Sequence, residues 1–517
     1  MKHQNYFRWL VVTLFAAAAA PIAPIARTEE PVPLGTDREL FVDNYVIDRM
    51  ENVSRQIGTA VDRGKVLDLN EFPWEGCFCN YATVLYDNGK YRLYYRGYGG
   101  SPQGGPPNPC WGCYAESENG IDWVKPKLGI VPFPSRGEED TANNIILANN
   151  IILAEEQNVP GVPGSGKRYV SDNFAPFIDN RPGVPDSQRY KGAGGNYALW
   201  FLYSEDGIHW HHYAEDQPLA AENYLFDSQN VSFWSATEKK YLLYMRGSDE
   251  IGRTVARAQS DDYVHWSEPK LMEYKTPEGE PARRFQYYIS QTAPYFRAPQ
   301  IAIATPVRFM QNRQAVSQEE AKKLSIADPS EIDYWIRDCT DVGLLSTRGG
   351  NSFVQPFDEA LIRPGIGSHN WISRTNYPAS GIVPTGPNEM SIYLLCDYAQ
   401  ETIHLRRYTF RTDGLASIHA GATAGRLITK PIQFEGNHLE LNYSTSAAGY
   451  VSVEIQDTEG RAIPGFSKAD CGEMIGNEID AVVHWQGNSD ISALRGKTIR
   501  LVFELADADI YSFRPAP

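Results

Sequence analysis

Three carboxylic acids stand near the expected beginnings of strands in this chain. They are Glu75, Asp227 and Glu389, each close to an apolar stretch of the kind that forms a buried strand. Hydrolysis of a glycosidic bond needs one carboxyl group that protonates the leaving oxygen and a second that acts as base or nucleophile. Acids on strands that converge on one point could supply this pair. We therefore take these three residues as the candidate catalytic groups.

Each acid has a candidate role and a plainer alternative. Glu389 is the candidate general acid, because it follows a Gly-Pro-Asn turn at 386–388 and precedes an apolar run, so that burial on one side would raise its pKa. Asp227 would orient sugar hydroxyls or tune the acid, and Glu75 or Asp172 would act as base. The alternatives are a solvated carboxylate for Glu389, a turn-capping residue for Asp227 and a surface charge for Glu75.

Polar and aromatic residues near the same strand ends could bind the sugar. Guanidinium groups suit carboxylated or sulfated sugars, aromatic rings can stack on a sugar ring, and a histidine can add a hydrogen bond. The alternative for the aromatic residues is a place in the core. The candidate substrate-binding residues are Asp172, Asn230, Tyr295, Arg297, Arg363, His369, Trp371 and Arg374. No Ser-His-Asp order, phosphate-binding glycine loop or dinucleotide fingerprint stands out, so no cofactor is predicted.

Residues 226–266 predict the element that positions these groups. Apolar and aromatic runs within 226–234 and 240–247, followed by a third strand at 254–260, form a meander of about four strands, which is typical of a propeller blade. In a propeller the innermost strands converge on the axis. Side chains at the beginnings of these strands therefore face one another across a funnel, although they are distant in sequence.

A short motif repeats along the chain. The segments 117–123, 204–210 and 260–266 each place a Trp just after a polar turn, and 346–353 and 412–418 are weaker versions. Five copies predict five supersecondary units with loop insertions between them. These turns either hold a ligand or only join outer strands. We favour the second interpretation, so the repeat argues for the fold alone.

The chain is predicted to be all-β, with a five-bladed β-propeller at 37–424 and a β-sandwich at 425–517. Strands of blades one, two, four and five are expected within 81–96, 172–204, 287–347 and 370–411, with a helical stretch near 317–324. Beyond residue 425 the sequence alternates between apolar and polar residues, as half-buried antiparallel strands do. The sandwich is expected to be structural rather than carbohydrate-binding. Residues 39–50 are expected to form a short strand and turn that pack on the propeller.

Composition and the N-terminus limit the partners and the location. The chain has 517 residues, 42% of them hydrophobic, and 43 glycines, a mixture suited to many short strands and tight turns. Its formal net charge of -16 disfavours nucleic-acid partners, since an acidic surface repels phosphates. Lys2, His3 and Arg8 precede an Ala-rich apolar run at 9–20 that is too short to span a bilayer. We interpret residues 1–26 as a signal peptide, which predicts a secreted or periplasmic protein without a membrane span.

Four of the seven cysteines are close together in the sequence. Cys77, Cys79, Cys110 and Cys113 have the count of a four-thiolate zinc site, but they fall across two strands of the first blade rather than on paired turns. The alternatives are a disulfide within this group and plain buried or free thiols. We predict no metal site.

Several segments together resemble a known superfamily. They are Tyr-Arg-Leu-Tyr-Tyr-Arg at 91–96, Ser-Glu-Asp-Gly-Ile-His-Trp at 204–210, Phe-Asp-Ser-Gln-Asn at 226–230 and Pro-Thr-Gly-Pro-Asn-Glu-Met at 384–390. On these segments the chain resembles the five-bladed propeller superfamily of glycoside hydrolase families 32, 43 and 68. It resembles more closely a secreted bacterial group of glycosyl hydrolase-like proteins, over the range 40–513.

The resemblance implies an axial site with three acids, onto which Asp227 and Glu389 are placed by their positions in the blade pattern. Blade one lacks both the Asn-Asp-Pro-Asn-Gly segment of the fructosidases and the Asp-Pro of the arabinanases. The sequence therefore predicts an exported glycoside hydrolase that cleaves a polysaccharide or its oligosaccharides by paired-carboxylate acid/base catalysis. The alternatives are a noncatalytic carbohydrate-binding propeller, and a sialidase-like or lyase enzyme that uses the arginines on an acidic sugar.

Overall fold

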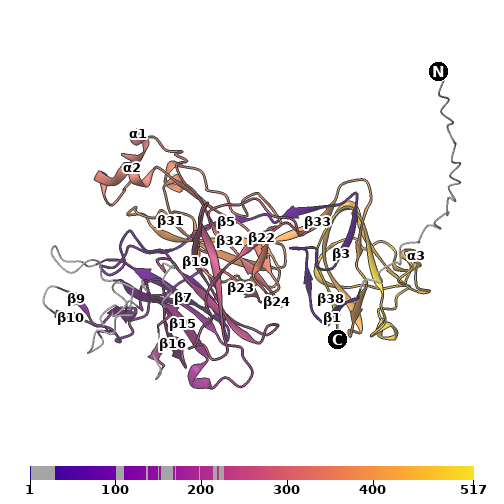
Figure 1. The fold of residues 1–517 in the computed structure, drawn as a ribbon, viewed down its shortest axis with the longest axis horizontal. Coiled ribbons are helices and arrows are strands. Elements are labelled where there is room, and N and C mark those ends of the chain that lie inside the picture. Colours follow the sequence, from indigo (N-terminus) through magenta and orange to yellow (C-terminus); the bar gives the residue numbers. More distant parts are fainter. Residues whose placement is uncertain are drawn as a thin grey trace.

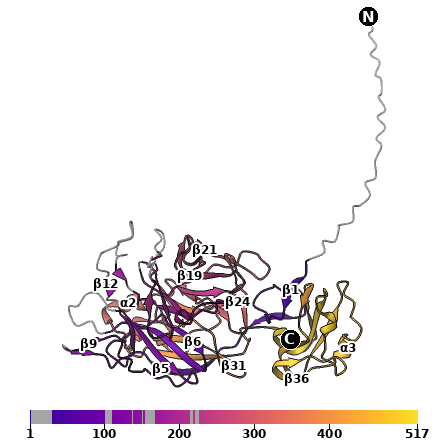
Figure 2. The same ribbon diagram turned by 90° about the horizontal axis from the view of Figure 1, so that it is seen from below.

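The computed structural model describes residues 1, 30–99, 110–135, 138–148, 151–152, 167–168, 170–196, 198–213, 218–219 and 226–517. They form five β-sheets arranged as the blades of a propeller, with a second β unit beside it (Figures 1 and 2). The predicted five-bladed propeller is confirmed. The predicted signal peptide lies, except for its first residue, outside the described residues. Across the described ranges, no helix is both long and apolar enough to cross a membrane.

Each of the first three blades is a four-stranded antiparallel sheet. Blade one contains β6 (Thr83–Asp87), β7 (Lys90–Gly97), β8 (Trp111–Ser117) and β11 (Ile145–Ala148). Blade two contains β14 (Ala175–Ile178), β15 (Tyr190–Gly194), β16 (Trp200–Ser204) and β17 (His211–His212). Blade three contains β18 (Val231–Ser235), β19 (Lys240–Asp249), β20 (Gly252–Ser260) and β21 (Lys270–Leu271). The middle strands carry continuous apolar runs because neighbouring blades cover both of their faces.

Blade four carries an insertion between its second and third strands. The blade contains β23 (Ala293–Tyr295), β24 (Ala298–Ala304), β27 (Leu345–Thr347), β28 (Ser352–Val354) and β22 (Glu273–Lys275). Between β24 and β27 the chain continues into a hairpin of β25 (Val307–Met310) and β26 (Cys339–Val342), which carries α1 (Gln318–Ala321) and α2 (Ile332–Trp335). The helical stretch predicted near 317–324 is therefore confirmed. Figure 1 shows both helices projecting from one end of the propeller.

Blade five joins distant parts of the chain. Its inner strands β29 (Tyr377–Pro378) and β30 (Val383–Gly386) both pair with β31 (Glu389–Cys396), which pairs with β32 (His404–Arg411). The outermost strand is β5 (Val61–Asp68), from the N-terminal part of the chain. This strand is not among those expected from the sequence. Its own residues are mostly polar, so that only its pairing partner marks it as part of a blade.

The repeated motif forms a turn that reaches the preceding blade. In blade two, the Asp206 carboxylate accepts hydrogen bonds from the backbone N–H groups of Ile208 and His209, both at 2.8 Å. The ring of Trp210 lies edge-on to Tyr94 of blade one, with centroids 6.3 Å apart. None of these residues lines the cavity described below. The motif therefore serves to join neighbouring blades.

Replacement of Asp206 by alanine is expected to lower the free energy of unfolding by about 1 kcal/mol, the usual contribution of a side chain that caps backbone N–H groups. Asp206→Asn should cost clearly less. Blade one already has Asn119 at this position, where its amide oxygen accepts from the N–H groups of Ile121 and Asp122, both at 2.9 Å. Urea denaturation of the two variants measures the difference, and equal losses would contradict a capping role.

The Asp206 charge adds a pH dependence to this stability. Partial burial opposes ionisation, but hydrogen bonds from His209, Ile208 and Ser204 outweigh it and hold the pKa of Asp206 at about 2. The resulting stabilisation is present above the pKa of an unfolded aspartate and is lost as the pH falls through the folded value. The gap between the protein and Asp206→Asn should therefore shrink between pH 5 and pH 2.

A second β unit follows the propeller. Its longest strands, β36 (His438–Gln456) and β38 (Arg500–Ala516), pair antiparallel and enclose an apolar core. The unit also contains β1 (Val32–Gly35), β33 (Ala416–Ala420), β34 (Gly425–Thr429), β35 (Ile432–Phe434) and β37 (Asn477–Val482), and α3 (Lys468–Cys471) lies between β36 and β37. The clean alternation of the sequence is explained by one face of each strand packing into that core.

The segment expected to pack on the propeller is shared between both units. β2 (Glu39–Leu40) pairs with β38 and β3 (Ile47–Glu51) with β34, so this segment belongs to the sheet of the second unit. β4 (Ser54–Ile57) pairs with β33 in the same sheet. The side chains alternate: Phe41 enters the core of the second unit, whereas Leu40 and Val42 pack against blades four and five. The unit thus begins before the propeller in sequence, which differs from the predicted boundaries.

A buried ion-pair network joins the two units. The guanidinium of Arg38 lies 2.9 Å from Glu440 and 2.6 Å from Asp480 of the second unit. It also lies 3.7 Å from Asp413, which Arg297 of blade four approaches to 3.2 Å. Relative movement of the two units would break the ion pair between Arg297 of blade four and Asp480 of the second unit, so the network holds the units in their present arrangement.

Candidate functional site

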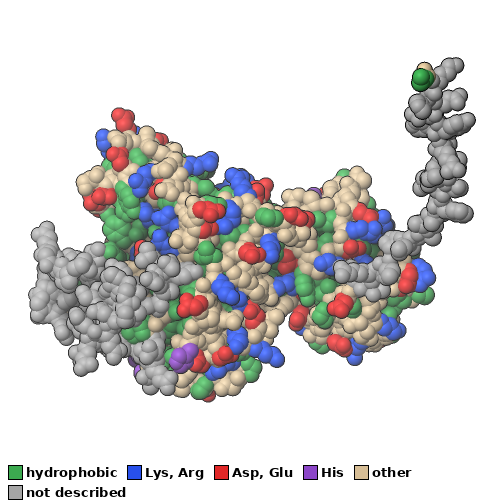
Figure 3. All heavy atoms as spheres, in the orientation of Figure 1, with side chains coloured by type: hydrophobic (Ala, Val, Ile, Leu, Met, Phe, Trp, Pro, Cys, Tyr) green, Lys and Arg blue, Asp and Glu red, His purple; other side chains and the backbone are tan. Residues whose placement is uncertain are grey.

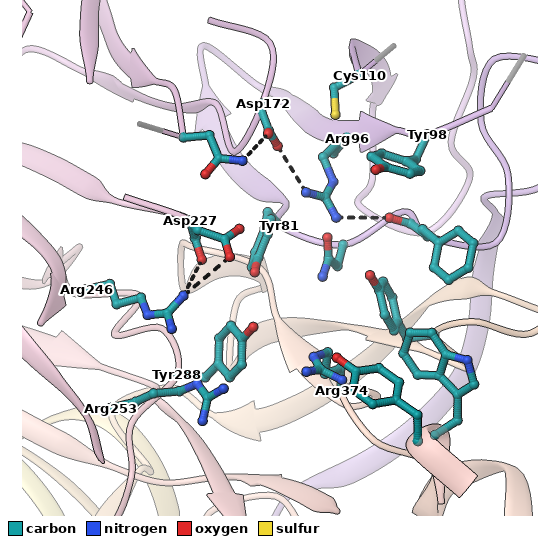
Figure 4. Close-up of a pocket in the computed structure, with 16 residues that line it drawn as sticks. Tyr81, Arg96, Tyr98, Cys110, Asp172, Asp227, Arg246, Arg253, Tyr288 and Arg374 are labelled. Carbon is teal, nitrogen blue, oxygen red and sulfur yellow. Dashed lines mark hydrogen bonds and ion pairs between the residues drawn. The ribbon is translucent and has the colours of Figure 1, made fainter. Parts of the chain in front are cut away.

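A cavity of about 750 Å³ lies at one end of the propeller axis. All five blades contribute to its wall, and Figure 4 shows the side chains pointing into the common space. The lining residues are Phe78, Asn80, Tyr81, Arg96, Tyr98, Cys110, Asp172, Asn196, Asp227, Arg246, Arg253, Tyr288, Tyr334, Trp335, Arg374 and Tyr398. It is therefore the place where the distant acids and arginines of the sequence can meet.

Strand direction decides which residues reach this cavity. Asp172 and Asp227 precede the inner strands β14 and β18, so the beginnings of the inner strands lie at the cavity. The second strand of each blade runs antiparallel to the first, which brings its end to the same place. Arg96 and Arg246 lie near the ends of β7 and β19 and enter the cavity in this way.

Several residues at the inner strands adopt a backbone conformation that is rare outside glycine. They are Tyr81, Asn173, Gln291, Arg374 and Asn376, with φ of 58°, 60°, 50°, 63° and 58°. Such left-handed positions cost about 1 to 3 kcal/mol each and persist where the surrounding structure imposes them. Two of the five, Tyr81 and Arg374, line the cavity directly. Their clustering points to a site for which side-chain direction matters.

Two buried glutamines join the inner strands of the blades. Gln291 donates from its amide to the Gln229 side-chain oxygen at 2.6 Å and to the Pro378 carbonyl at 2.7 Å. Gln229 in turn donates to the Thr83 hydroxyl at 3.0 Å. These bonds connect the inner strands of four blades across the axis. A second cavity of about 570 Å³, bordered by the inner strands themselves, lies beyond them.

Asp172 is a fixed carboxylate in the cavity wall. One oxygen accepts from Arg96 at 3.0 Å, and the other accepts from the Asn196 amide at 3.1 Å (Figure 4). The side chains of Asp172 and Arg96 are both about nine-tenths buried. A charge-paired carboxylate held by two partners keeps its position when a ligand enters.

Asp227 has a different environment. Among the ion pairs of the described residues, its carboxylate contacts only Arg246, at 3.5 Å, and 55% of its side chain remains exposed within the cavity. Partial desolvation by the cavity wall raises the pKa of Asp227; Arg246 opposes the increase and the nearby Asp172 charge adds to it. A carboxyl group with a raised pKa that faces open space is suited to donate a proton.

Four arginines and seven aromatic residues complete the wall. Arg96 lies over the ring of Tyr81, with the guanidinium carbon 4.8 Å from the ring centroid. Arg253 lies over Tyr288 at 4.7 Å, and Arg374 lies over Tyr334 at 4.8 Å. Stacking on aromatic faces fixes each guanidinium while leaving its N–H groups directed at the cavity.

The blade-four insertion supplies the outer rim. Tyr334 and Trp335 stand at the end of α2, with ring centroids 4.9 Å apart. Trp335 also packs against Phe78 of blade one at 5.8 Å and Tyr398 of blade five at 5.8 Å. The insertion therefore bridges two other blades over the cavity. Aromatic faces at such a rim are suited to stack on sugar rings.

Comparisons with known proteins give fold-level likenesses only. No family model matches the chain, and no curated protein matches it. A glycosyl hydrolase from Bacteroides ovatus is 13% identical, with 70% of this chain and 96% of that chain covered and a TM-score of 0.38. An N-acetylgalactosamine deacetylase from F. plautii is 12% identical, with 68% and 96% covered and a TM-score of 0.37. These two proteins differ in their described activities, and at such values the likeness says nothing about chemistry.

Glu389 does not reach the cavity. It begins β31, a second strand, and therefore lies at the opposite end of the blade from the beginnings of the inner strands. Its carboxylate pairs with Arg407 and, at 3.0 Å, with Arg63. The expected meeting of Glu389 with Asp227 across the axis is thus not found, because the prediction placed the beginnings of first and second strands at the same end.

Glu75 is buried away from the cavity, not a surface charge. Its side chain is 0% exposed and pairs with Lys125 at 2.6 Å. It also accepts from the Tyr95 hydroxyl at 2.6 Å and from the backbone N–H groups of Glu71 and Phe72 at 2.8 and 3.0 Å. These partners occupy both carboxylate oxygens of Glu75, so the carboxylate is not available to a substrate. The residue fixes the loop before blade one.

The eight predicted substrate-binding residues divide into two groups. Asp172 and Arg374 line the cavity. The other six, Asn230, Tyr295, Arg297, Arg363, His369 and Trp371, do not. Asn230 is buried and donates to the Phe226 and Ser228 carbonyls, so it shapes the turn that presents Asp227.

The remaining predicted residues have other surroundings. The Tyr295 hydroxyl donates to Asp413 at 2.8 Å, and Arg297 belongs to the network between the two units. Arg363 and Trp371 border a separate cavity of about 410 Å³ beside the blade-four hairpin. The His369 ring lies 3.0 Å from the Asn370 amide. The types of these residues and their proximity in sequence to strand ends predicted a binding role. The directions of the strands place them outside the axial cavity.

Two of the cavity residues that the sequence did not predict, Arg96 and Arg246, share a repeated sequence signal. Arg96 and Arg246 end the segments Tyr-Arg-Leu-Tyr-Tyr-Arg-Gly at 91–97 and Tyr-Leu-Leu-Tyr-Met-Arg-Gly at 241–247. An Arg-Gly pair at the end of the second strand in two blades marks the same position twice. Arg253 and Tyr288 have no comparable signal.

The cysteines form neither a disulfide nor a metal site in the part of the chain that the structure covers. None of the seven takes part in a disulfide, and Cys79 donates to the Leu69 carbonyl at 3.2 Å. No group of three or more His, Cys, Asp or Glu side chains among the described residues could hold a metal ion. Burial raises the pKa of the Cys79 and Cys113 thiols well above the usual value, as expected of inert core residues.

Proposed function

We propose that this chain is a glycan-acting enzyme that hydrolyses a glycosidic bond in the axial cavity, with Asp227 as general acid and Asp172 as the second carboxylate. One observation carries the proposal: two carboxylates line the same cavity in contrasting environments. Asp172 is held by Arg96 and Asn196, whereas Asp227 faces open space with a raised pKa. Pairs of acids whose environments differ in this way take the separate roles of acid and base.

The reaction assigns one step to each group. The proton of Asp227 passes to the glycosidic oxygen while the bond between this oxygen and the anomeric carbon breaks, with the electron pair leaving on the oxygen. A water oxygen forms the new bond to the anomeric carbon, and the water proton passes to Asp172. Arg246 then stabilises the carboxylate that remains on Asp227. No cofactor takes part in these steps.

The aromatic wall supports a sugar as the ligand. Sugar rings have apolar faces and polar edges, and the cavity combines stacked rings with amides and charged groups. Trp335 and Tyr334 at the rim could hold the part of a chain that leaves the cavity. Export through the predicted signal peptide at 1–26, as a secreted or periplasmic protein, is part of the proposal, since extracellular polysaccharides would then be accessible.

A screen of purified protein against a panel of polysaccharides tests the proposal. We expect new reducing ends with at least one glycan, and none with the double variant Asp172→Asn/Asp227→Asn. Glu389→Gln, outside the cavity, should behave as the unmodified protein does. Binding without turnover by the unmodified protein would favour a noncatalytic carbohydrate-binding propeller, and products that absorb in the ultraviolet would indicate a lyase. Either result would overturn hydrolysis.

A further inference from the structure

We propose that the cavity recognises an acidic sugar, through an oxyanion substituent bound between Arg253 and Arg374 above the ring of Tyr288. This inference rests on the proposed function for the location of the site and adds the class of substrate. It concerns residues other than the two acids.

Among the residues that the structure describes, the cavity wall carries more positive than negative charge. These residues include four arginines and two carboxylates. Arg96 pairs with Asp172 at 3.0 Å and Arg246 with Asp227 at 3.5 Å. Among the ion pairs of the described residues, none involves Arg253 or Arg374 together with a carboxylate. Two guanidinium groups therefore face the cavity without a counterion from this part of the chain.

Both of these arginines are held by neutral partners. Arg253 donates from Nη1 to the Gln286 side-chain oxygen at 3.1 Å, and its Nε is buried without a hydrogen-bond partner. Arg374 donates from Nη1 to the Ser373 hydroxyl at 3.4 Å. A buried guanidinium N–H that lacks a partner loses its hydration without compensation. A ligand oxyanion in the cavity would supply the counterion that these neutral partners do not provide.

The two groups lie against one common aromatic ring. The ring of Phe309 lies 4.5 Å from the Arg253 guanidinium carbon and 6.0 Å from that of Arg374. The ring centroid of Tyr288 lies 4.7 Å from the guanidinium carbon of Arg253 and 5.5 Å from that of Arg246. Like charges repel unless an anion lies between them. Figure 4 shows Arg253, Tyr288 and Arg374 together along one side of the cavity, opposite Asp172.

This concentration differs from the rest of the molecule. The chain has 48 Lys and Arg against 64 Asp and Glu, and Figure 3 shows both signs interspersed over one face. Arg374 also adopts the left-handed conformation, with φ of 63°. A strained backbone that directs an arginine into a cavity without a counterion is expected where the arginine meets a ligand. A carboxylate and a sulfate both fit, since each offers paired oxygens to a guanidinium.

Equilibrium binding to Asp227→Asn tests the proposal without turnover. The probes are trigalacturonate, its methyl ester, galactose 6-sulfate and galactose, measured by calorimetry or ligand-observed NMR. We expect a charged probe to bind at least about tenfold more tightly than its uncharged counterpart, as a charge-assisted hydrogen bond gives. Tighter binding of trigalacturonate than of its methyl ester indicates a carboxylate. Tighter binding of galactose 6-sulfate than of galactose indicates a sulfate. Equal affinities in both pairs would overturn the proposal.

Two cavity variants and one matched control locate the effect. Arg253→Met and Arg374→Met keep an apolar stem over the aromatic rings and remove the charge. Each should weaken the charged probe about tenfold to hundredfold and leave the neutral probe unchanged. Arg181→Met is the control, because Arg181 also lies over aromatic rings, 5.4 Å from the Tyr241 centroid, outside the cavity. An equal effect of all three variants, or none, would contradict the assignment.

The result is separable from the proposed function. Cleavage of neutral glycans by a protein that does not prefer charged probes would leave the hydrolase intact and reject the acidic-sugar inference. Charge-selective binding that depends on Arg253 and Arg374, in a protein that cleaves no glycan of the panel, would support the acidic-sugar inference and reject the hydrolase.

Discussion

Replacement of Asp227 by asparagine is expected to lower kcat for an unactivated glycan by about 10²-fold to 10⁴-fold, the usual contribution of a positioned general acid. Asparagine fills the same space but cannot donate the proton that the leaving oxygen needs. The folded state should be almost unaffected. The Asp227 side chain is 55% exposed and its ion pair with Arg246 is 3.5 Å long, while the Arg246 bond to the Asp227 carbonyl, 2.9 Å, does not depend on the carboxylate.

The leaving group distinguishes loss of the acid from general damage. A 4-nitrophenyl glycoside of the same sugar needs little protonation of its leaving oxygen, so Asp227→Asn should retain much more activity on this substrate than on the glycan. KM should change little. Similar losses on both substrates would show that Asp227 acts in another way, and unchanged kcat on the glycan would exclude the role altogether. Glu389→Gln serves as the control, since its carboxylate pairs with Arg407 and Arg63 outside the cavity.

The pH profile gives an independent measurement of the same group. A general acid works only in its protonated form, so activity falls as the pH rises through its pKa. Partial desolvation raises the pKa of Asp227, which moves this alkaline limb to higher pH than an ordinary aspartate would give. The limb should disappear from kcat/KM in Asp227→Asn. Its persistence would assign it to another group.

Glu75→Gln is expected to lower the free energy of unfolding by about 3 to 5 kcal/mol, the usual effect of removing one partner of a buried ion pair. The change leaves Lys125 charged, 5% exposed and without its closest partner, formerly at 2.6 Å. Activity per folded molecule should stay within a few-fold, because neither residue lines the cavity. Urea denaturation followed by tryptophan fluorescence measures the loss.

A double variant separates the ion pair from other effects of the substitution. Lys125→Met alone should also be strongly destabilising, because it leaves Glu75 buried with its negative charge unpaired. Glu75→Gln/Lys125→Met should lose clearly less than the two single losses combined, since neither charge then remains. Additive losses would contradict a direct pair. A Glu75→Gln variant that folds normally but does not turn over would support the catalytic role first expected for Glu75.

The sequence predicted the architecture better than the site. The repeated motif and the apolar runs of the blades are local features, and they identified five units; the helical stretch near 317–324 was likewise predicted from its own segment. Asp227 was found because it directly precedes an inner strand, whose beginning must face the axis. Glu389 was misplaced by the same reasoning applied to a second strand, which runs the other way. Strand direction within a blade, rather than residue type, separates these two cases.

Other parts of the site depend on contacts between segments distant in sequence. Arg253 reaches the cavity from blade three and lies against Phe309 of the blade-four hairpin, a contact that no local pattern indicates. Glu75 could not be recognised as an internal ion pair, because its partner Lys125 is 50 residues away, beyond β8. The repeated Arg-Gly at the ends of β7 and β19 was the one available sign, visible only when two blades are aligned.

The pairing of β5 with β32 has a consequence for biosynthesis. His404 of β32 lies opposite Asp68 of β5, so more than three hundred residues emerge from the ribosome before these two strands can pair and close the ring. Until then β5 is an unprotected edge, able to pair with a neighbouring nascent chain. A chain truncated before residue 404 would contain four nearly complete sheets. It would remain an open arc, because β5 would have no β32 with which to pair.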